Sequence, residues 1–433
     1  MNRLALISLG CPKNLVDSGN LVKKLRAAGF SHVERPEDAD LVLVNTCGFI
    51  ESAKRESIAE VLGLTAVAGK KQRRKLVVFG CLAQRYREEL EKEIPEIDAV
   101  FGVGAEAEIV EYCRSLLKRT PRARDAGLRR VSAAPVGAAP YEYLKISEGC
   151  DRGCSYCVIP SIRGAYRSRE PEEIIREAGM AVKAGKRELI LIGQDITEYG
   201  RDLQGEDLAS LVRRIAGIDG DFRIRLLYLY PTAVSDALIE TIRDVDKVCR
   251  YIDMPLQHSE DRILKLMKRG GSRAFYERLI RKIRTRIPGV TLRTTMIVGF
   301  PQETDEDFDG LLAFVKKMRF DRLGAFLYSR EKGSEAYGLK GTVPMAVRRR
   351  RYHLLMAAQA GISLEKNKSL VGKTFRALVD DVDGLGAVAR LESQAPEIDG
   401  VTILNEPGLR KGEFVRVRIT GAYDYDLMAE RVP

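Results

Sequence analysis

Short apolar runs alternate with stretches of helical spacing in the first quarter of the chain. The apolar runs at 4–9, 41–45, 76–79 and 99–101 predict buried strands, and residues 17–28 and 51–62 predict helices between them. Alternation of strand and helix is typical of a parallel sheet with right-handed crossovers. We therefore predict a parallel α/β domain over residues 1–118.

The same alternation resumes after a segment that has no sustained period. Residues 119–140 are rich in Pro, Gly, Ala and Arg, which predicts a linker. Strands are then predicted at 143–147, 189–192, 224–229, 251–254, 292–298 and 323–328. Six β/α units over residues 141–366 indicate a partial (β/α)6 barrel, in which the chemistry belongs at the carboxyl ends of the strands.

The pattern changes to closely spaced strands in residues 367–433. The segments TFRALV, GAVARL, GVTILN, EFVRVRIT and YDLMAE each have the length of a strand, and apolar and polar residues alternate from Val415 to Thr420. Five short strands predict a small antiparallel β-barrel of the oligonucleotide-binding type. The predicted fold class is therefore α/β with a terminal β-barrel.

Composition adds information mainly through charge. The chain has 433 residues, which is too long for one ordinary core, and its 45% hydrophobic and 31% charged residues are typical of a soluble globular protein. Its formal net charge of +11 favours polyanionic partners such as RNA or a ribosomal surface. No apolar run approaches the length of a membrane span. We expect no membrane partner and a cytoplasmic location, where clustered thiols more often bind metal than form disulfides.

Three cysteines follow the predicted strand YLKIS within one short loop. Cys150, Cys154 and Cys157 form a CxxxCxxC run. Thiolates at this spacing can hold one iron–sulfur cube, and because a 4Fe-4S cluster normally takes four cysteines, three leave one iron open to a ligand. A zinc knuckle is the alternative, but zinc takes four ligands and no fourth Cys or His lies nearby in the sequence.

Three further cysteines each follow a predicted strand of the N-terminal domain. These are Cys11, Cys47 and Cys81. Because the carboxyl ends of parallel strands share one edge of the sheet, we expect these thiols to meet as a second three-thiolate site. The alternative is that they are small buried residues of the core. Cys113 and Cys249 have no such setting, and we predict that they are core residues.

Together these motifs resemble the radical S-adenosylmethionine superfamily. An N-terminal domain with three spaced cysteines and a C-terminal small barrel, the TRAM module, is similar to its methylthiotransferases, over essentially the whole chain. GCPKNLVDS at 10–18 is similar to the ribosomal branch, which modifies an aspartate of protein twelve of the small subunit, whereas the transfer-RNA branch tends to read GCQMN. Gln302 departs from the family pattern GFPGET, which has glycine at this place.

The resemblance implies roles for these cysteines. Cys150, Cys154 and Cys157 would ligate a radical-generating 4Fe-4S cluster that binds the methionine end of S-adenosylmethionine. Cys11, Cys47 and Cys81 would hold an auxiliary 4Fe-4S cluster carrying the sulfur to be donated, and both clusters would face one chamber. Contacts to the cofactor are predicted at barrel strand ends, for Gln194, Asp195, Gln257, His258, Arg293, Thr295 and Val298.

The implied reaction transfers a methylthio group to the β-carbon of the aspartate, with S-adenosylmethionine as methyl donor and radical source. Its partners would be the small-subunit ribosomal protein or the ribosome, and an electron donor of the flavodoxin or ferredoxin class; the sequence identifies neither this donor nor the sulfur source. A transfer-RNA adenosine methylthiotransferase is the alternative, but aromatic residues that could stack bases total only 7%. A non-catalytic iron–sulfur carrier is the rival from another class, and it would not need a six-strand barrel.

Overall fold

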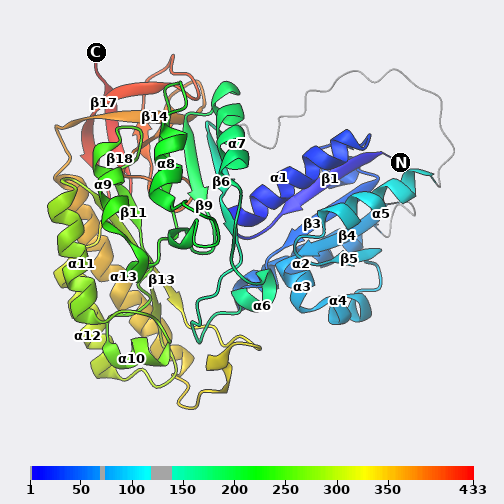
Figure 1. Ribbon diagram of the computed structural model, residues 1–433, viewed down its shortest axis with the longest axis horizontal. Coiled ribbons are helices and arrows are strands. Elements are labelled where there is room, and N and C mark those ends of the chain that lie inside the picture. The colour runs from blue at the N-terminus through cyan, green and yellow to red at the C-terminus, as the bar shows by residue number, and fades with distance from the viewer. Residues whose placement is uncertain (1, 69–73, 119–138) are drawn as a thin grey trace. The chain divides into compact units, whose positions relative to one another are not determined.

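A computed structural model describes residues 2–68, 74–118 and 139–433 (Figure 1). These residues divide into two compact units. The first contains the described residues before 139 together with 158–165 and 331–333, and the second contains 139–157, 166–330 and 334–433. Glu331 belongs to the first unit, where it pairs with Lys54 and Arg85 at 3.1 and 3.0 Å. Almost all of the predicted linker lies outside the described residues.

A parallel sheet forms the centre of the first unit. Its order in the described residues is β2 (Ser31–His32), β1 (Arg3–Ser8), β3 (Leu41–Thr46), β4 (Lys75–Gly80) and β5 (Ala99–Phe101). Every neighbouring pair is parallel. The four longer strands lie within one residue of their predicted ends, whereas the two residues of β2 are too few to show a period.

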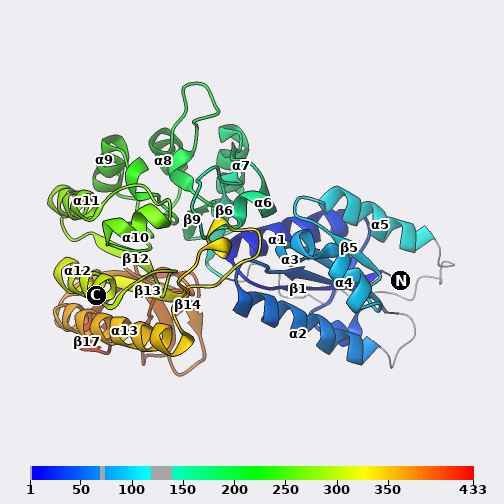
Figure 2. The same ribbon diagram turned by 90° about the horizontal axis from the view of Figure 1, so that it is seen from below.

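Helices cover both faces of this sheet. The helices of the unit are α1 (Pro12–Ala27), α2 (Glu51–Ala68), α3 (Cys81–Arg85), α4 (Arg87–Glu93), α5 (Glu106–Lys118) and α6 (Ile159–Arg163). Residues of α1 and α5, such as Leu21 and Ile109, pack on one face, and residues of α2, α3 and α4, such as Val61 and Leu90, pack on the other. Figure 2 shows α5 and α2 on opposite sides of the sheet. β3 is buried along its whole length, as a central strand of a three-layer α/β domain should be.

Parallel strands form an open barrel in the second unit. They are β6 (Tyr141–Lys145), β9 (Glu188–Ile192), β10 (Arg223–Leu226), β11 (Tyr251–Asp253), β12 (Thr291–Val298) and β13 (Arg322–Leu327). β6, β9 and β10 form one ladder, and β11, β12 and β13 form another. Backbone hydrogen bonds from Leu229 to Asp253 and from Cys249 to Ile224 bridge β10 and β11. In the part of the chain that the structure describes, no ladder joins β13 to β6, so the barrel is partial as predicted.

Helices pack around the outside of this barrel, and four of them begin at a side-chain cap. They are α7 (Pro171–Lys183), α8 (Leu208–Ala216), α9 (Asp236–Asp244), α10 (Asp261–Leu266), α11 (Arg273–Arg286), α12 (Asp305–Met318) and α13 (Met345–Lys368). Asp207 before α8 and Thr304 before α12 accept the backbone N–H three residues later, which fixes where each helix starts. A short antiparallel pair, β7 (Ser147–Glu148) and β8 (Arg167–Ser168), flanks the cysteine loop.

No helix among the described residues combines the length and the apolar character that a membrane span requires.

A closed five-stranded barrel follows α13 in the described chain. Its order is β14 (Thr374–Val382), β15 (Ala387–Leu391), β16 (Thr402–Leu404), β18 (Leu427–Arg431) and β17 (Phe414–Ala422). In β17, Val415 and Val417 are buried and Arg416 and Arg418 are exposed, as the alternation predicts. The barrel differs from the predicted antiparallel arrangement at one pair, because β16 and β18 run parallel. An odd number of strands cannot close with every neighbouring pair antiparallel.

Buried charges join the open barrel to the closed one. Glu188 of β9 contacts Arg223 and Arg225 of β10 at 2.8 and 2.6 Å, and Arg390 of β15 at 2.7 Å. Burial alone would raise the pKa of Glu188, but the charges of the three guanidinium groups hold it well below its usual range. These contacts tie the two barrels of the second unit through groups removed from water.

Candidate functional site

The loop that carries Cys150, Cys154 and Cys157 lies after β7, and none of the three forms a disulfide with a described residue. Ser155 anchors this loop, since its N–H donates to the carbonyl of Met267 at 2.9 Å and its carbonyl accepts the N–H of Ala336 at 2.7 Å. Cys154 is buried and the other two thiols are half-buried. The structure therefore presents the three loop thiols from one anchored segment, as the spacing predicts.

Two arginines stack on the ring of Tyr230 beside this loop. The guanidinium carbons of Arg152 and Arg269 each lie 4.0 Å from the ring centroid. Arg152 donates to a carboxylate oxygen of Asp195 at 2.8 Å, and Arg269 Nη1 lies 3.6 Å from Cys154 Sγ. The second contact brings a buried positive charge to one thiol of the loop.

Cys11, Cys47 and Cys81 lie at the carboxyl ends of neighbouring strands. They follow β1, β3 and β4, which are adjacent in the sheet. Burial raises the pKa of Cys47 to about 11, and the thiols of Cys11 and Cys81 are close enough to raise it further. A Cβ placed on Gly10 would lie 2.9 Å from Cys47 Sγ, so the chain leading to Cys11 passes directly beside Cys47. The three thiols thus share one region, while their role as ligands stays a prediction.

Glycines beside these thiols permit the close approach of the strand ends. Gly80 has φ of +97°, and a Cβ on it would lie 2.2 Å from Asn45 Oδ1. A Cβ on Gly48 would lie 2.7 Å from the backbone of Leu82. Any larger residue at either position would force the backbone segments apart.

Asn14 and Ser57 fix the backbone around the same thiols. Asn14 Nδ2 donates to the carbonyls of Leu9 and Thr46 at 2.9 and 3.3 Å, which links the ends of β1 and β3. Ser57 Oγ accepts the N–H of Cys47 at 3.0 Å and donates to its carbonyl at 3.1 Å. Neither residue is among the site residues predicted from the sequence. Asn14 stands in the GCPKN motif, which was a usable signal, whereas nothing in the sequence marks Ser57.

Arg163 reaches the same region from much later in the chain. It is the last residue of α6, and its segment belongs to the first unit. Its Nη2 donates to Asn14 Oδ1 at 2.7 Å and lies 3.5 Å from Cys81 Sγ, and its Nη1 lies 3.1 Å from a carboxylate oxygen of Asp17. Burial raises the pKa of Cys81, and the charge of Arg163 opposes that rise. Sequence spacing gives no hint of this contact, because 82 residues separate the two.

Neither set of thiols forms a site for a single metal ion among the described residues, and their role as cluster ligands stays a prediction. Across residues 2–68, 74–118 and 139–433, no three His, Cys, Asp or Glu side chains converge on a point where one ion could be held. A cube separates its ligands, because each thiolate binds a different iron. Burial also raises the pKa of Cys150, against a hydrogen bond from the N–H of Arg152. Protonated buried thiols of this kind release their protons when metal binds.

Gln194 and Gln257 remain candidate cofactor contacts at barrel strand ends. Gln194 Nε2 donates to Glu148 at 2.7 Å, and its buried Oε1 has no hydrogen-bond partner among the described residues. Gln257 follows β11 with φ of +73°, and its N–H donates to the carbonyl of Thr295 at 2.8 Å. Strained non-glycine backbone of this kind gathers at ligand sites. Thr295 remains a candidate through the same backbone pairing.

Asp195 and His258 are engaged by structural partners. Asp195 accepts from Arg152 and from the backbone N–H of Thr197, so it braces the cysteine loop. His258 is completely buried; its Nδ1 accepts the N–H of Glu260 at 3.1 Å, and its Nε2 lies 3.7 Å from Glu303. Their contacts to the cofactor stay predictions, which we do not carry further.

Arg293 and Val298 have different surroundings on β12, and their contacts to the cofactor stay predictions. Arg293 is the third residue of the strand, toward its amino end, and pairs with Asp253 at 2.8 Å and with Asp399 of the closed barrel at 3.7 Å. Val298 is completely buried in the core between the barrel and its helices. Because alternate residues of a strand face opposite sides, the side chains of Arg293 and Val298 point in opposite directions from β12.

Tyr228 and Phe326 are strand-end residues that our sequence analysis missed. Tyr228 follows β10 with φ of +69°, which parallels the strained backbone of Gln257. Phe326 lies near the carboxyl end of β13, opposite Ile297 of β12, and 53% of it is exposed. An aromatic side chain left open on a barrel strand is available to a ligand.

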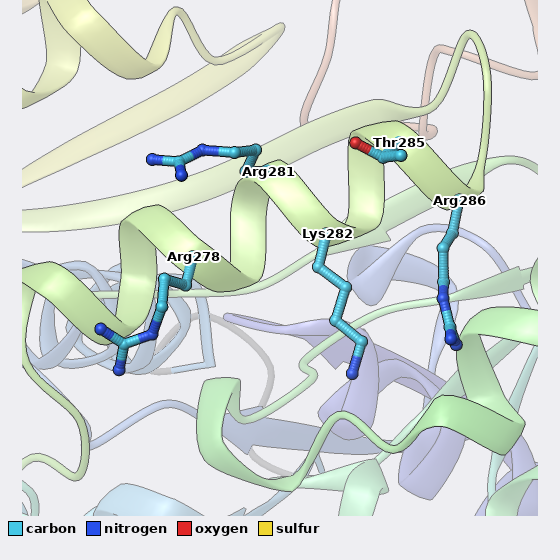
Figure 3. A pocket seen from close by; sticks show the side chains of 5 residues that line it. All are labelled: Arg278, Arg281, Lys282, Thr285 and Arg286. Carbon is cyan, nitrogen blue, oxygen red and sulfur yellow. The ribbon is translucent and has the colours of Figure 1, made fainter.

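A shallow pocket on the outer face of α11 contains none of these residues. Its volume is about 330 Å³. Figure 3 shows the side chains that line it, Arg278, Arg281, Lys282, Thr285 and Arg286. Lys282 and Arg286 both pair with Asp236, at 2.5 and 3.2 Å. This is the chemistry of a solvated basic helix face, and we assign it no role.

Comparisons with protein families match three successive segments. Uncharacterized protein family UPF0004 matches residues 3–102, the radical SAM superfamily matches 144–315, and the TRAM domain matches 371–432. The radical SAM match contains the CxxxCxxC loop and the open barrel through most of α12. The superfamily implies a 4Fe-4S cluster and S-adenosylmethionine as cofactors.

Curated relatives match over nearly the full chain. The ribosomal protein uS12 methylthiotransferase RimO of Thermodesulfovibrio yellowstonii is 50% identical, covering 99% of each chain. Those of Geotalea uraniireducens and Geobacter sulfurreducens are 45% and 44% identical, covering 100% and 99% of this chain and 98% of their own. The fold is also similar to the radical S-adenosylmethionine methyltransferase TsrM of Kitasatospora setae, with a TM-score of 0.57 at 15% identity over 84% of this chain and 89% of that one. Identity and coverage of this extent show that the chain belongs to the RimO family of radical SAM methylthiotransferases.

Proposed function

We propose that this enzyme transfers a methylthio group to the β-carbon of an aspartate of ribosomal protein uS12, with S-adenosylmethionine as methyl donor and radical source. The observation that carries the proposal is near-full-length similarity to proteins named uS12 methylthiotransferases. The same names favour the protein substrate over a transfer-RNA adenosine. Two sets of three cysteines, none of them in a disulfide with a described residue, support the proposal, because thiolates could hold the clusters that such a reaction needs.

Cys150, Cys154 and Cys157 are the residues that would hold the radical-generating 4Fe-4S cluster. Bound together, cluster and cofactor would supply the means to break an unactivated C–H bond, which acid–base groups cannot readily open. The chain contributes binding and orientation. Ser155 and Arg152 hold the loop in place. The Oε1 of Gln194 has no hydrogen-bond partner within the described residues and would offer a polar contact to the cofactor.

Cys11, Cys47 and Cys81 are the residues that would hold a second 4Fe-4S cluster. Three thiols leave one position of a cube without a protein ligand, and sulfur for donation would be held there. Gly10, together with Asn14, keeps the strand ends close enough for the thiols to gather.

The partners and the cellular location follow from the proposed substrate and chemistry. The substrate would be uS12, free or within the small subunit, and a flavodoxin-class or ferredoxin-class protein would supply electrons. The cytoplasm is the proposed location, because the substrate is ribosomal and thiols stay reduced there.

Anaerobic reconstitution with iron and sulfide tests the proposal. The loaded enzyme receives S-adenosylmethionine, a reductant and a uS12 peptide that contains the aspartate. We expect 5′-deoxyadenosine and a peptide heavier by one methylthio substitution. Cys154→Ala should give neither product, and Cys81→Ala should give no methylthio peptide. Modification of transfer RNA but not of the peptide would overturn the substrate assignment.

A further inference from the structure

We infer that Arg163 is a positioning residue of the second thiol site, where it orients and stabilises the thiolate of Cys81 and hence the cluster proposed at Cys11, Cys47 and Cys81. The inference rests on the proposed function. It gives the auxiliary site a charged residue from the segment that directly continues the radical-SAM loop.

The geometry holds this guanidinium in one orientation. Asp17 contacts Nη1 at 3.1 Å and Asn14 Oδ1 accepts from Nη2 at 2.7 Å, which leaves Nη2 3.5 Å from Cys81 Sγ. The side chain of Arg163 is only 2% exposed. A planar fork fixed by two polar partners loses little further freedom on meeting a third, so its contact to sulfur is pre-organised.

The segment after the cysteine loop brings this charge to Cys81. Five residues separate Cys157 from Arg163, and residues 158–165 belong to the first unit. Val158 and Ile162 pack with Cys81 in a small apolar cluster. The segment thus supplies both an apolar cover and one positive charge to the same thiol.

A buried thiolate needs such a charge. Cys81 is 5% exposed, and an uncompensated negative charge removed from water is costly. Hydrogen bonds to cluster sulfurs and the net charge around a cluster set its reduction potential. Arg163 therefore makes the auxiliary cluster easier to reduce and slower to lose its iron.

Arg269 offers a matched control in the second unit. Its Nη1 lies 3.6 Å from Cys154 Sγ, so its contact with a loop thiol resembles the contact of Arg163 with Cys81. Removing either arginine should change only the cluster whose thiol it contacts.

The test uses the full chain with all three loop cysteines changed to alanine, so that only the auxiliary cluster can form. Arg163→Gln, Arg163→Lys and Arg269→Gln are made in this background and reconstituted. We expect Arg163→Gln to shift the midpoint potential to more negative values and to speed iron loss to a chelator about tenfold, the scale on which outer-shell changes act at metal sites. Arg163→Lys should restore most of the potential, because it keeps the charge, and lose iron at an intermediate rate. Arg269→Gln should change neither quantity.

Unchanged potential and iron loss in Arg163→Gln would overturn the inference, and so would equal shifts of the potential in Arg163→Gln and Arg163→Lys. If circular dichroism shows that Arg163→Gln does not fold, Arg163→Lys decides, since a wild-type rate of iron loss would contradict the positioning role. A parent background that takes up no cluster would overturn the proposed two-cluster function itself, before any arginine is changed.

Discussion

Gln302 adopts a left-handed backbone conformation that glycine adopts more readily. Its φ is +68°, which costs a non-glycine residue about 1–2 kcal/mol. Replacement by glycine removes this cost. It also increases the conformational entropy of the unfolded chain, which lowers the free energy of unfolding by about 0.4–1 kcal/mol. We predict that Gln302→Gly raises the free energy of unfolding by roughly 0.5–1 kcal/mol in urea titrations. Gln302→Ala, which keeps the cost of this conformation, should bring no gain. A destabilised glycine variant would contradict this account of the position.

Cys113 gives the first unit a pH dependence above neutrality. Burial raises its pKa to about 12 from an unfolded value near 9. The folded chain therefore holds a proton that the unfolded chain has lost, so stability falls as the pH rises above 9. Between pH 9 and 11 we expect the free energy of unfolding to fall more steeply in the wild type than in Cys113→Ala, by up to about 1.4 kcal/mol per pH unit. Parallel urea titrations of the cluster-free proteins check this, and identical slopes would contradict it.

Some of the site residues could be predicted from the sequence and others could not. The six ligand candidates could be predicted from spacing and from their places after strands. Arg163 and Ser57 could not, because both act through tertiary contacts with no local pattern. Strand-end position alone did not show that Val298 packs in the core or that Arg293 pairs with Asp253, and the predicted cofactor contacts of both residues stay predictions.

At the scale of elements, one carboxylate on β9 ties the open barrel to β15 of the closed barrel. Removing its charge would deprive three buried guanidinium groups of their ion pair with this carboxylate. We predict that Glu188→Gln lowers the free energy of unfolding by about 3–5 kcal/mol at pH 7. Because the folded pKa is depressed, this contribution is present above the ordinary carboxyl pKa and is lost as the pH falls below it. Glu172→Gln, which breaks an exposed pair with Arg214, is the control and should change stability far less. Equal effects of the two substitutions would contradict the buried role.

Strands were predictable where an apolar run or a period of two extends over at least three residues. β2, β7 and β8 are two residues each and carry no such pattern. β10 ends at Leu226 rather than at the predicted 229, since the chain leaves the ladder before the left-handed turn at Tyr228. The five strands predicted from the sequence already require one parallel pair in a closed barrel, but local pattern does not encode that this pair is β16 and β18.

At the scale of the whole molecule, the chain joins three segments that match different family models. The matched ranges 3–102, 144–315 and 371–432 fall inside the predicted domains 1–118, 141–366 and 367–433, whose boundaries stay predictions. The compact division differs, because it places both barrels in one unit and gives residues 158–165 to the other. Long-range packing of this kind has no signature in composition or periodicity.

Mass spectrometry of uS12 and of digested transfer RNA from a strain lacking this gene tests the central claim most directly. We predict that uS12 lacks its methylthio group while transfer RNA is unchanged. The wild-type gene should restore the modification, and Cys81→Ala or Cys154→Ala should not, although both proteins accumulate. Fully modified uS12 in the deletion strain, or restoration by Cys81→Ala at the wild-type level, would contradict the account.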